Sequence, residues 1–264
     1  SATPPPAGGE ELKLWRRTVK NEAAAPADVR SFDCVITGGG IAGCCAALSA
    51  ARSGITVALI HDRPVLGGNA SQEVRVATRG EIRHPIVDEI DTMALGNRDD
   101  AAAMADTARL ARIQAEPNIT LFMPWRAEDA GTDASGRITH VDARHVQGAQ
   151  RVRLQAPLFI DCTGDGWIGY WAGADYRMGT ESRAEFGESR APVTANTKTM
   201  GSSLMWKTKT GTVASTFPAV PWAMDVAGTR ADTGGDWNWE YGMSLDTIED
   251  TEAIRDHLLR AIYG

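Results

Sequence analysis

The chain has 264 residues, enough to bury a full core as one large domain or two smaller ones. Its formal net charge of −7 argues against nucleic acid as the main partner, because phosphate binding needs a basic surface. No apolar run approaches the roughly 20 residues that cross a bilayer, so we expect no membrane span. The sequence opens at "SATPPPAGGEE" without an initiator Met. We expect a soluble protein, cytoplasmic or exported with its signal already removed, and the sequence leaves the compartment open.

The first 30 residues are rich in Pro, Ala and charge, and we interpret them as an N-terminal arm outside the core. From Phe32 the pattern changes. "FDCVITG" predicts a short buried strand, "IAGCCAALSAARSG" predicts a helix closed by Gly54, and "ITVALIH" predicts a second strand. Continuous apolar runs of this kind are typical of strands buried on both faces of a parallel sheet.

Residues 69–98 show no clear period and are expected to form a loop with possible site residues. "DDAAAMADTARLARIQAEPN" predicts an amphipathic helix and "ITLFMPW" a strand. Residues 126–166 indicate a small antiparallel meander that turns at "TDASGR" and ends in another buried strand, "LFIDCTG". Beyond Ala174 the sequence is rich in Trp, Thr and Gly and shows no simple hydrophobic alternation. A last helix is expected over about residues 247–262.

The four cysteines lie in apolar stretches with no CxxC or Cys/His spacing, so buried thiols and no metal site are expected: Cys34, Cys44, Cys45 and Cys162.

Residues 38–43, "GGGIAG", match the G-x-G-x-x-G pattern between a predicted strand and a predicted helix. Gly38 permits a tight turn, Gly40 lets the backbone approach a pyrophosphate, and Gly43 lets the helix pack close to the strand. The unpaired N–H groups and positive dipole end of the helix favour an anion there. This pattern predicts a dinucleotide site.

A dinucleotide site usually has an acid at the end of its second strand, where it binds the adenosine ribose. Here His61 occupies that position and Asp62 follows it. Two alternatives remain: His61 hydrogen-bonds the ribose, or Asp62 reaches it through a local shift. Gly67 and Gly68 then offer a second bare stretch of backbone, which FAD would use and a plain NAD domain does not need.

"VITGGGIAGCCAALSAARSGITVALIHDRPVLGGNAS" resembles the FAD-binding start of the glutathione-reductase-like flavoproteins, and "FIDCTGDGWIGYWAGADYRMG" resembles their second fingerprint. Together with the later "ESRAEFGES", "TMGSSLMWKT" and "WNWEYG", they resemble FAD-dependent oxidoreductases of a group often labelled xanthan-lyase-like. The similarity covers about residues 31–264.

The resemblance implies an α/β fold: a Rossmann-like FAD-binding domain over residues 31–176, with a central parallel sheet and a small antiparallel meander. Residues 177–264 would begin a second, substrate domain. FAD is the implied cofactor. The residues implied to hold FAD are Gly38, Gly40, Ile41, Ala42, Gly43, His61, Asp62, Arg63, Gly67, Gly68, Asn69, Ala70, Ser71, Arg126, Ala127, Thr163, Gly164 and Asp165.

Members of this family are usually longer and carry a late Gly-Asp fingerprint, which has no convincing copy before Gly264. We therefore expect the N-terminal portion of a larger protein, with a missing C-terminal part of the same protein as one partner. A homo-oligomer is a further possibility that the sequence leaves open.

The simplest reaction is hydride transfer from a polar organic substrate to the flavin, assisted by a side-chain base. The candidates for catalysis are Glu73, Arg75 and His84, although an ordinary loop or surface role is the simpler interpretation of each. Trp222, Trp237, Trp239 and Tyr241 could line a sugar site or simply pack in the core.

Three functions remain open. The first is an FAD-dependent oxidoreductase acting on a small molecule or oligosaccharide, with carbohydrate as the first guess. The second is an FAD-assisted carbohydrate lyase that uses transient oxidation. The third is a non-catalytic dinucleotide-binding protein. Net elimination without consumption of an electron acceptor would distinguish the second from the first.

Overall fold

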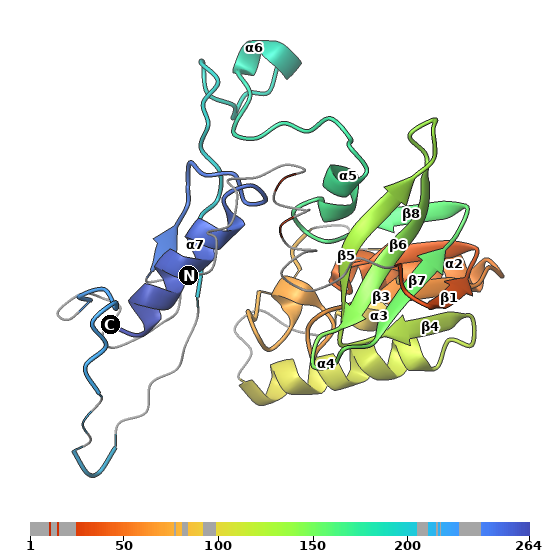
Figure 1. The fold of residues 1–264 in the computed structure, drawn as a ribbon, viewed down its shortest axis with the longest axis horizontal. Helices are drawn as coiled ribbons and strands as arrows, with labels where there is room; N and C mark the ends of the chain where they lie inside the picture. The colour runs from red at the N-terminus through yellow and green to blue at the C-terminus, as the bar shows by residue number, and fades with distance from the viewer. Residues whose placement is uncertain are drawn as a thin grey trace. The chain divides into compact units, whose positions relative to one another are not determined.

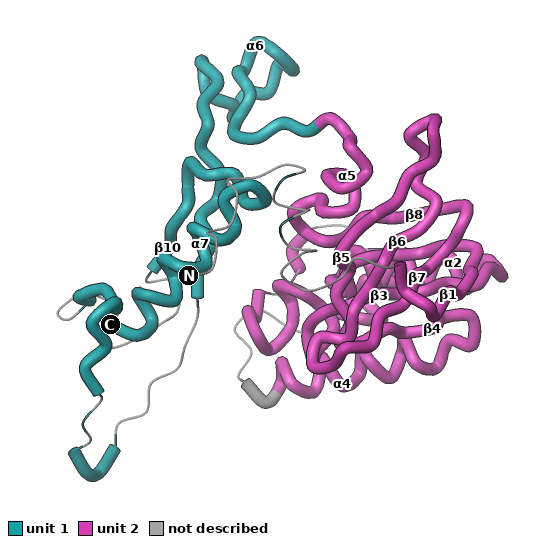
Figure 2. Tube along the Cα trace, viewed as in Figure 1, with its two compact units in different colours: residues 1–23, 176–264 teal, residues 24–175 magenta. Residues whose placement is uncertain are grey.

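The computed structural model describes residues 11, 15, 25–76, 78–80, 84–91, 99–204, 211–214, 216, 218–226 and 239–264. The chain divides into two compact units, Ala24–Asp175 and a second made of Ser1–Ala23 with Tyr176–Gly264 (Figure 2). Every helix in the described part of the chain is too short or too polar to span a lipid bilayer.

A parallel sheet lies at the centre of the Ala24–Asp175 unit (Figure 1). Its strands run in the order β4-β3-β2-β8, and every neighbouring pair is parallel. All positions of the two central strands are buried, which explains their unbroken apolar runs. The strands are β2 (Cys34–Thr37), β3 (Val57–Ile60), β4 (Ile119–Phe122) and β8 (Leu158–Asp161). The parallel sheet expected from the sequence is confirmed.

Helix α2 (Ile41–Arg52) connects β2 to β3 and packs on the sheet through small side chains, including Cys44, Ala47 and Ala51. Its end agrees with the expected stop, because Gly54 follows it with a φ of 92°. Helix α4 (Asp99–Gln114) precedes β4, as its amphipathic pattern predicted.

The stretch expected to be a loop contains two short elements, a 3-10 turn η1 (Gly68–Ala70) and helix α3 (Pro85–Ile90). The ring nitrogen Nδ1 of His84 accepts the Ile86 N–H at 3.2 Å and so caps α3. Six residues are too few for a helical period to be visible in the sequence, which explains why α3 was not predicted.

A second sheet has the order β1-β7-β6-β5 and packs on the first through buried side chains such as Val141, Leu154 and Val35. The antiparallel meander is confirmed in β5 (Trp125–Thr132), β6 (Ile138–His145) and β7 (Arg151–Gln155). The sequence predicts an arm outside the core up to residue 30, but its last residues belong to strand β1 (Asp28–Ser31), which pairs parallel with β7. All positions of β1 are exposed, so no apolar pattern marks it as a strand.

None of the four cysteines forms a disulfide, and no group of His, Cys, Asp and Glu among the described residues could hold a metal ion. Cys34 and Cys44 are buried, whereas Cys45 and Cys162 are half-buried. Burial raises the pKa of the Cys44 thiol to about 12.

The second unit contains α6 (Arg183–Phe186), β9 (Ser202–Ser203), β10 (Glu240–Tyr241) and α7 (Thr251–Ile262). Helix α7 confirms the predicted last helix. Its start is later than expected, because the Asp246 carboxylate accepts the N–H groups of Ile248 and Glu249 in a preceding turn.

The predicted aromatic cluster of this unit divides into separate contacts. Trp239 donates from Nε1 to Nε2 of His257 at 3.2 Å, and Tyr241 stacks on the same imidazole with 3.6 Å between ring centres. Trp222 instead contacts Tyr263, with 5.0 Å between ring centres. Trp237 lies outside the described residues.

Candidate functional site

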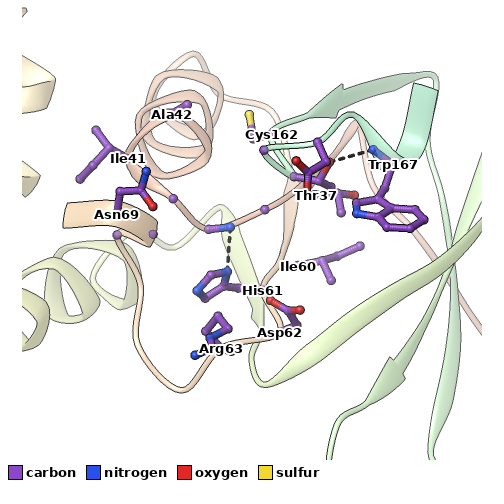
Figure 3. A pocket seen from close by; sticks show the side chains of 18 of the residues that line it. Thr37, Ile41, Ala42, Ile60, His61, Asp62, Arg63, Asn69, Cys162 and Trp167 are labelled. Carbon is purple, nitrogen blue, oxygen red and sulfur yellow. Dashed lines mark hydrogen bonds between the residues drawn. The ribbon is translucent and has the colours of Figure 1, made fainter. Parts of the chain in front are cut away.

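A cavity of about 720 Å³ opens at the carboxyl ends of the parallel strands, entirely within the Ala24–Asp175 unit. This volume falls in the roughly 300–1,000 Å³ range of small-molecule sites. In open α/β sheets the carboxyl edge is where ligands bind. Figure 3 shows Ile41 and Asn69 at one end and Asp62 and Trp167 at the other, with the backbone of the glycine loop between them.

The glycine loop after β2 has little room for side chains. Gly38 has a φ of 101°, and a Cβ on it would lie 2.1 Å from the carbonyl oxygen of Cys162. A Cβ on Gly43 would lie 1.8 Å from the carbonyl oxygen of Gly38. The turn expected of Gly38 and the close helix packing expected of Gly43 are therefore confirmed.

Gly40 differs from its neighbours, because a Cβ there would have no protein atom within 4 Å. It lines the cavity and is the N-cap residue of α2, with no side chain to cap the helix. The first turn of α2 also contains no acidic residue. The helix therefore presents its first N–H groups and the positive end of its dipole to the cavity, an arrangement that favours an anion.

The second glycine turn lies directly beside the first. The Gly67 N–H donates to the carbonyl oxygen of Gly39 at 2.8 Å, and Gly40 and Gly67 form a parallel β-bridge. A Cβ on Gly68 would come within 3.3 Å of the Gly40 Cα. Two bare stretches of backbone thus border the same part of the cavity.

His61 joins the two turns from below the glycine loop (Figure 3). Its ring nitrogen Nδ1 accepts the Gly39 N–H at 3.0 Å, and Nε2 lies 2.8 Å from the carbonyl oxygen of Val65, to which it donates. This pair of bonds assigns the neutral tautomer that carries its hydrogen on Nε2. Burial lowers the pKa of the imidazole, which reinforces the neutral form.

The hydrogen bonds of His61 bear on the alternatives left open by the sequence. Both ring nitrogens are occupied by the backbone, so neither is free for a ribose hydroxyl. Asp62 lines the cavity and is half-buried, and its carboxylate makes no hydrogen bond or ion pair within the described part of the chain. The geometry favours Asp62 as the ribose ligand, which stays a prediction.

The turn after β8 is organised by Asp161, which sequence reasoning did not single out. One carboxylate oxygen accepts the N–H and the hydroxyl of Thr163, and the other accepts the N–H groups of Ile168 and Gly169. The Thr163 hydroxyl in turn accepts the Trp167 N–H at 3.0 Å. An acid at the end of a strand and just before a short helix is the signal that could have identified this cap.

Three indole rings line the cavity and were also missed: Trp125, Trp167 and Trp171. Trp167 and Trp171 lie one turn apart on α5 (Trp167–Trp171), with 5.5 Å between ring centres. Trp125 meets Phe122 edge-on at 5.8 Å between ring centres. The four-residue spacing of Trp167 and Trp171 was the sequence signal from which this pair on α5 could have been predicted.

The structure brings nearly all of the predicted cofactor residues together around this cavity. Those that line it are Gly38, Gly40, Ile41, Ala42, His61, Asp62, Arg63, Gly67, Gly68, Asn69, Ala70, Arg126, Ala127, Thr163, Gly164 and Asp165. Gly43 and Ser71 are not among the lining residues. Gly43 packs against Gly38, and Ser71 is fully buried with its carbonyl accepting the Arg75 N–H at 2.7 Å.

The three candidates for catalysis are not among the residues that line the cavity. Glu73 accepts two hydrogen bonds from the Arg63 guanidinium, at 2.9 and 2.8 Å. Arg75 holds a left-handed backbone with a φ of 64°, and the exposed His84 caps α3. Their catalytic roles stay predictions.

A family model described as FAD dependent oxidoreductase matches residues 33–255. The chain belongs to this family. No curated protein sequence matches the chain.

Several solved structures are similar to part of this chain at low identity. A geranylgeranyl bacteriochlorophyll reductase-like protein from Thermoplasma acidophilum is 20% identical, with a TM-score of 0.39 over 56% of this chain and 43% of that one. L-proline dehydrogenase from P. horikoshii is 22% identical, with a TM-score of 0.34 over 52% of this chain and 23% of that one. THI4 from Thermovibrio ammonificans is 17% identical, with a TM-score of 0.41 over 67% and 69%. The chain thus spans less than half the length of the first two.

FAD is the cofactor of the family, and the residues present fit it. The pyrophosphate needs close backbone and unpaired N–H groups, which Gly40 and the start of α2 provide. The adenosine and flavin halves need space on both sides, and the cavity extends from Asp62 and Trp167 to Asn69 and Ile41 (Figure 3).

Proposed function

We propose that this chain forms the FAD-binding portion of an oxidoreductase in which a polar organic substrate gives up a hydride. The observation that carries the proposal is the pair of glycine turns around Gly40 and Gly67, joined by hydrogen bonds beside an uncapped helix end. When bound, FAD supplies the hydride acceptor. The protein supplies the binding energy and the orientation.

The two ends of the cavity would hold different parts of FAD. The N–H groups at the start of α2, next to Gly40, would bind the pyrophosphate. Asp62 would accept a ribose hydroxyl, and the rings of Trp125 and Trp167 would enclose the adenosine end. Asn69, at the opposite end, would contact the part of the cofactor nearer the flavin (Figure 3).

Proton transfer would fall to a side chain close to the flavin end. Glu73, three residues after η1, stays our candidate from the sequence; its carboxylate pairs with Arg63 and does not line the cavity, so it would have to leave this ion pair to reach a substrate. A base must reach the substrate proton within hydrogen-bond distance. Glu73→Gln should therefore lower the rate of flavin reduction by 10²-fold or more while leaving FAD affinity within about threefold.

A carbohydrate is the substrate class that we propose first. Flat aromatic rings suit the apolar faces of sugars, and the second unit carries three such rings in contact, those of Trp239, Tyr241 and His257. Anaerobic mixing with mono- and oligosaccharides should bleach the flavin absorption. Bleaching by amines or by 2-hydroxy acids, with none by sugars, would contradict this choice.

The proposal of FAD binding is tested by the visible absorption spectrum of the purified chain, repeated on the supernatant after heat denaturation. Flavin bands that move into the supernatant would establish a non-covalent cofactor. A colourless chain is then titrated with FAD, and Gly40→Ala serves as the matched control, because its methyl group occupies only cavity space. Uptake of FAD by the wild type and not by this variant is expected. No uptake by either would overturn the proposal.

A further inference from the structure

A buried charged trio lies behind the second glycine turn. Arg109 on α4 is completely buried, and its Nη1 donates to the Asp106 carboxylate at 2.8 Å. The Asp91 carboxylate lies 3.9 Å from Nη2 of the same guanidinium. Asp91 and Asp106 are 3% and 4% exposed, so the trio is almost cut off from water. The proposed reaction gives none of these residues a role.

All three side chains of the trio bind the backbone of one loop, which comprises residues 66–76 and 78 and which we name the post-β3 loop. Arg109 donates from Nη1 to the carbonyl oxygen of Leu66 at 2.7 Å. Asp106 accepts the Gln72 N–H at 3.0 Å. Asp91 accepts the Thr78 N–H at 3.0 Å and also its hydroxyl. The loop is thus held at its beginning, middle and end.

The same loop borders the cavity between these attachment points. Its lining residues are Gly67, Gly68, Asn69, Ala70, Val76 and Thr78. Asn69 lies near Ile41, at the end of the cavity away from Asp62 and Trp167 (Figure 3). The trio therefore acts on the half of the site opposite the adenosine end.

The glycine at position 67 is required by this arrangement. Gly67 has a φ of 116°, and a Cβ on it would lie 2.2 Å from Nη1 of Arg109. The guanidinium therefore packs directly against the turn that also donates to Gly39. Because Gly67 contacts Arg109 and also lines the cavity, a shift of the guanidinium would move the cavity wall at Gly67 directly.

General stability does not explain this choice of residues. Burying an ion pair costs desolvation free energy, and apolar side chains of similar volume often fill such a space equally well. Apolar side chains would leave the Leu66 carbonyl and the Gln72 and Thr78 N–H groups without these partners. The value of the trio therefore lies in fixing the backbone of the loop.

We propose that Arg109, with Asp106 and Asp91, is a positioning residue that holds the post-β3 loop in the shape that binds the flavin half of FAD. This inference rests on the proposed function and extends it. It predicts a separation between the two halves of the cofactor. Loosening the loop should weaken FAD much more than ADP, because ADP contains only the half that lies on the glycine loop and the adenosine end.

Arg109→Lys and Asp106→Asn are the first variants to make. Lysine keeps the positive charge but cannot donate to Ile90, Leu66 and Asp106 in the fixed planar geometry of a guanidinium. Dissociation constants for FAD and for ADP are measured on each variant by calorimetry. We expect FAD to bind at least tenfold more weakly and ADP to lose much less affinity, because ADP meets the loop only at the pyrophosphate, beside Gly67.

Arg52→Lys is the matched control. Arg52 pairs with Glu89 and Glu116 on the same face of the sheet, but it is exposed and does not contact the post-β3 loop. It should leave both dissociation constants unchanged. Equal weakening of FAD and ADP in Arg109→Lys, or no weakening, would overturn the inference.

Amide hydrogen exchange provides a second measurement that does not depend on the cofactor. The Gln72 and Thr78 amides should exchange faster in Arg109→Lys, while the Gly39 amide keeps its wild-type rate. Uniform acceleration would indicate general loosening and would contradict the inference. If Arg109→Lys does not fold, Asp91→Asn carries the same tests, because Asp91 does not line the cavity and the substitution removes the negative charge beside Arg109. A wild type that binds ADP and not FAD would contradict the proposed function, whereas the exchange rates would still decide the role of the trio.

Discussion

The backbone N–H of Gly39 donates to Nδ1 of His61 across 3.0 Å, and this bond joins the glycine loop to the end of β3. The other ring nitrogen of His61 holds the carbonyl of Val65, at the entry to the second glycine turn. Gly39 in turn accepts the Gly67 N–H through its own carbonyl. The imidazole of His61 and the backbone of Gly39 therefore fix the relative position of the two turns that border the cavity.

Replacing His61 should separate its hydrogen-bonding role from its bulk. His61→Phe leaves the Gly39 N–H buried without this acceptor, which costs about 1–3 kcal/mol of unfolding free energy. His61→Gln keeps one acceptor and one donor and should cost less than about 1 kcal/mol. Urea unfolding of both variants measures the difference. Equal losses in the two would show that ring packing, and not the bond to Gly39, is what matters.

The same bond predicts a pH dependence. Burial lowers the pKa of His61 in the folded chain, against smaller opposing effects of the Val65 carbonyl and the charges of Asp62 and Glu73. The unfolded chain, with an ordinary value of about 6.5, therefore binds the proton more readily. The contribution of His61 to stability is full above about pH 6.5 and is lost as the pH falls through the lower folded value.

Protonation would also place a hydrogen on Nδ1, where the Gly39 N–H now donates, so FAD affinity should fall over the same acidic range. Titrations of unfolding free energy and of the FAD dissociation constant between pH 7.5 and 5 would measure both effects. Burial also lowers the pKa of His140 and of His257, so the wild type alone is not diagnostic. The difference between wild type and His61→Gln isolates the contribution of His61. An identical pH profile in the two proteins would contradict the prediction.

Two glycines of the loop should respond differently to the same methyl group. Gly43→Ala places a Cβ 1.8 Å from the Gly38 carbonyl oxygen, so α2 must move, and overpacking of this kind costs about 1–3 kcal/mol. Gly40→Ala meets no protein atom within 4 Å and should lose less than about 1 kcal/mol. Its methyl group enters the cavity, so FAD binding should still fall at least tenfold. Thermal unfolding and FAD titration of both variants test this contrast, and loss of stability in Gly40→Ala comparable to that in Gly43→Ala would refute it.

The elements that could be predicted from the sequence are those whose cause is local. β2, α2 and β3 follow from apolar runs and a glycine pattern that are contiguous in the chain, and the predicted positions of Gly38 and Gly43 follow from the same stretch. Strand β1 escaped prediction, because its residues are exposed and only backbone pairing with β7 makes it a strand.

The parts of the site that escaped prediction depend on residues distant in sequence. Arg109 lies on a helix whose pattern predicts a solvated face for a charged residue, yet it is buried against Leu66 and Asp91. Nothing in a single sequence shows that these segments meet. The role of His61 was equally hidden, since only the structure shows that Gly39 and Val65 occupy its ring nitrogens.

Ribose recognition should belong to Asp62 and not to His61. Asp62 lines the cavity and lies beside His61 (Figure 3), and its carboxylate makes no hydrogen bond or ion pair to another described residue. A carboxylate that accepts a ribose hydroxyl contributes a charge-assisted hydrogen bond, worth about 1.5–3 kcal/mol. The wild type should therefore bind ADP at least tenfold more tightly than 2′-deoxy-ADP.

Asp62→Ala should abolish this preference by weakening ADP alone, so that ADP and 2′-deoxy-ADP bind equally. His61→Gln is the matched neighbour: it should weaken both nucleotides by the same factor and keep their ratio, because it acts on the glycine loop and not on the ribose. Competition calorimetry on the three proteins provides the ratios. If Asp62→Ala kept the preference and His61→Gln lost it, His61 would be the ribose ligand. The hydrogen bond between Gly39 and His61 would then have to break when the nucleotide binds.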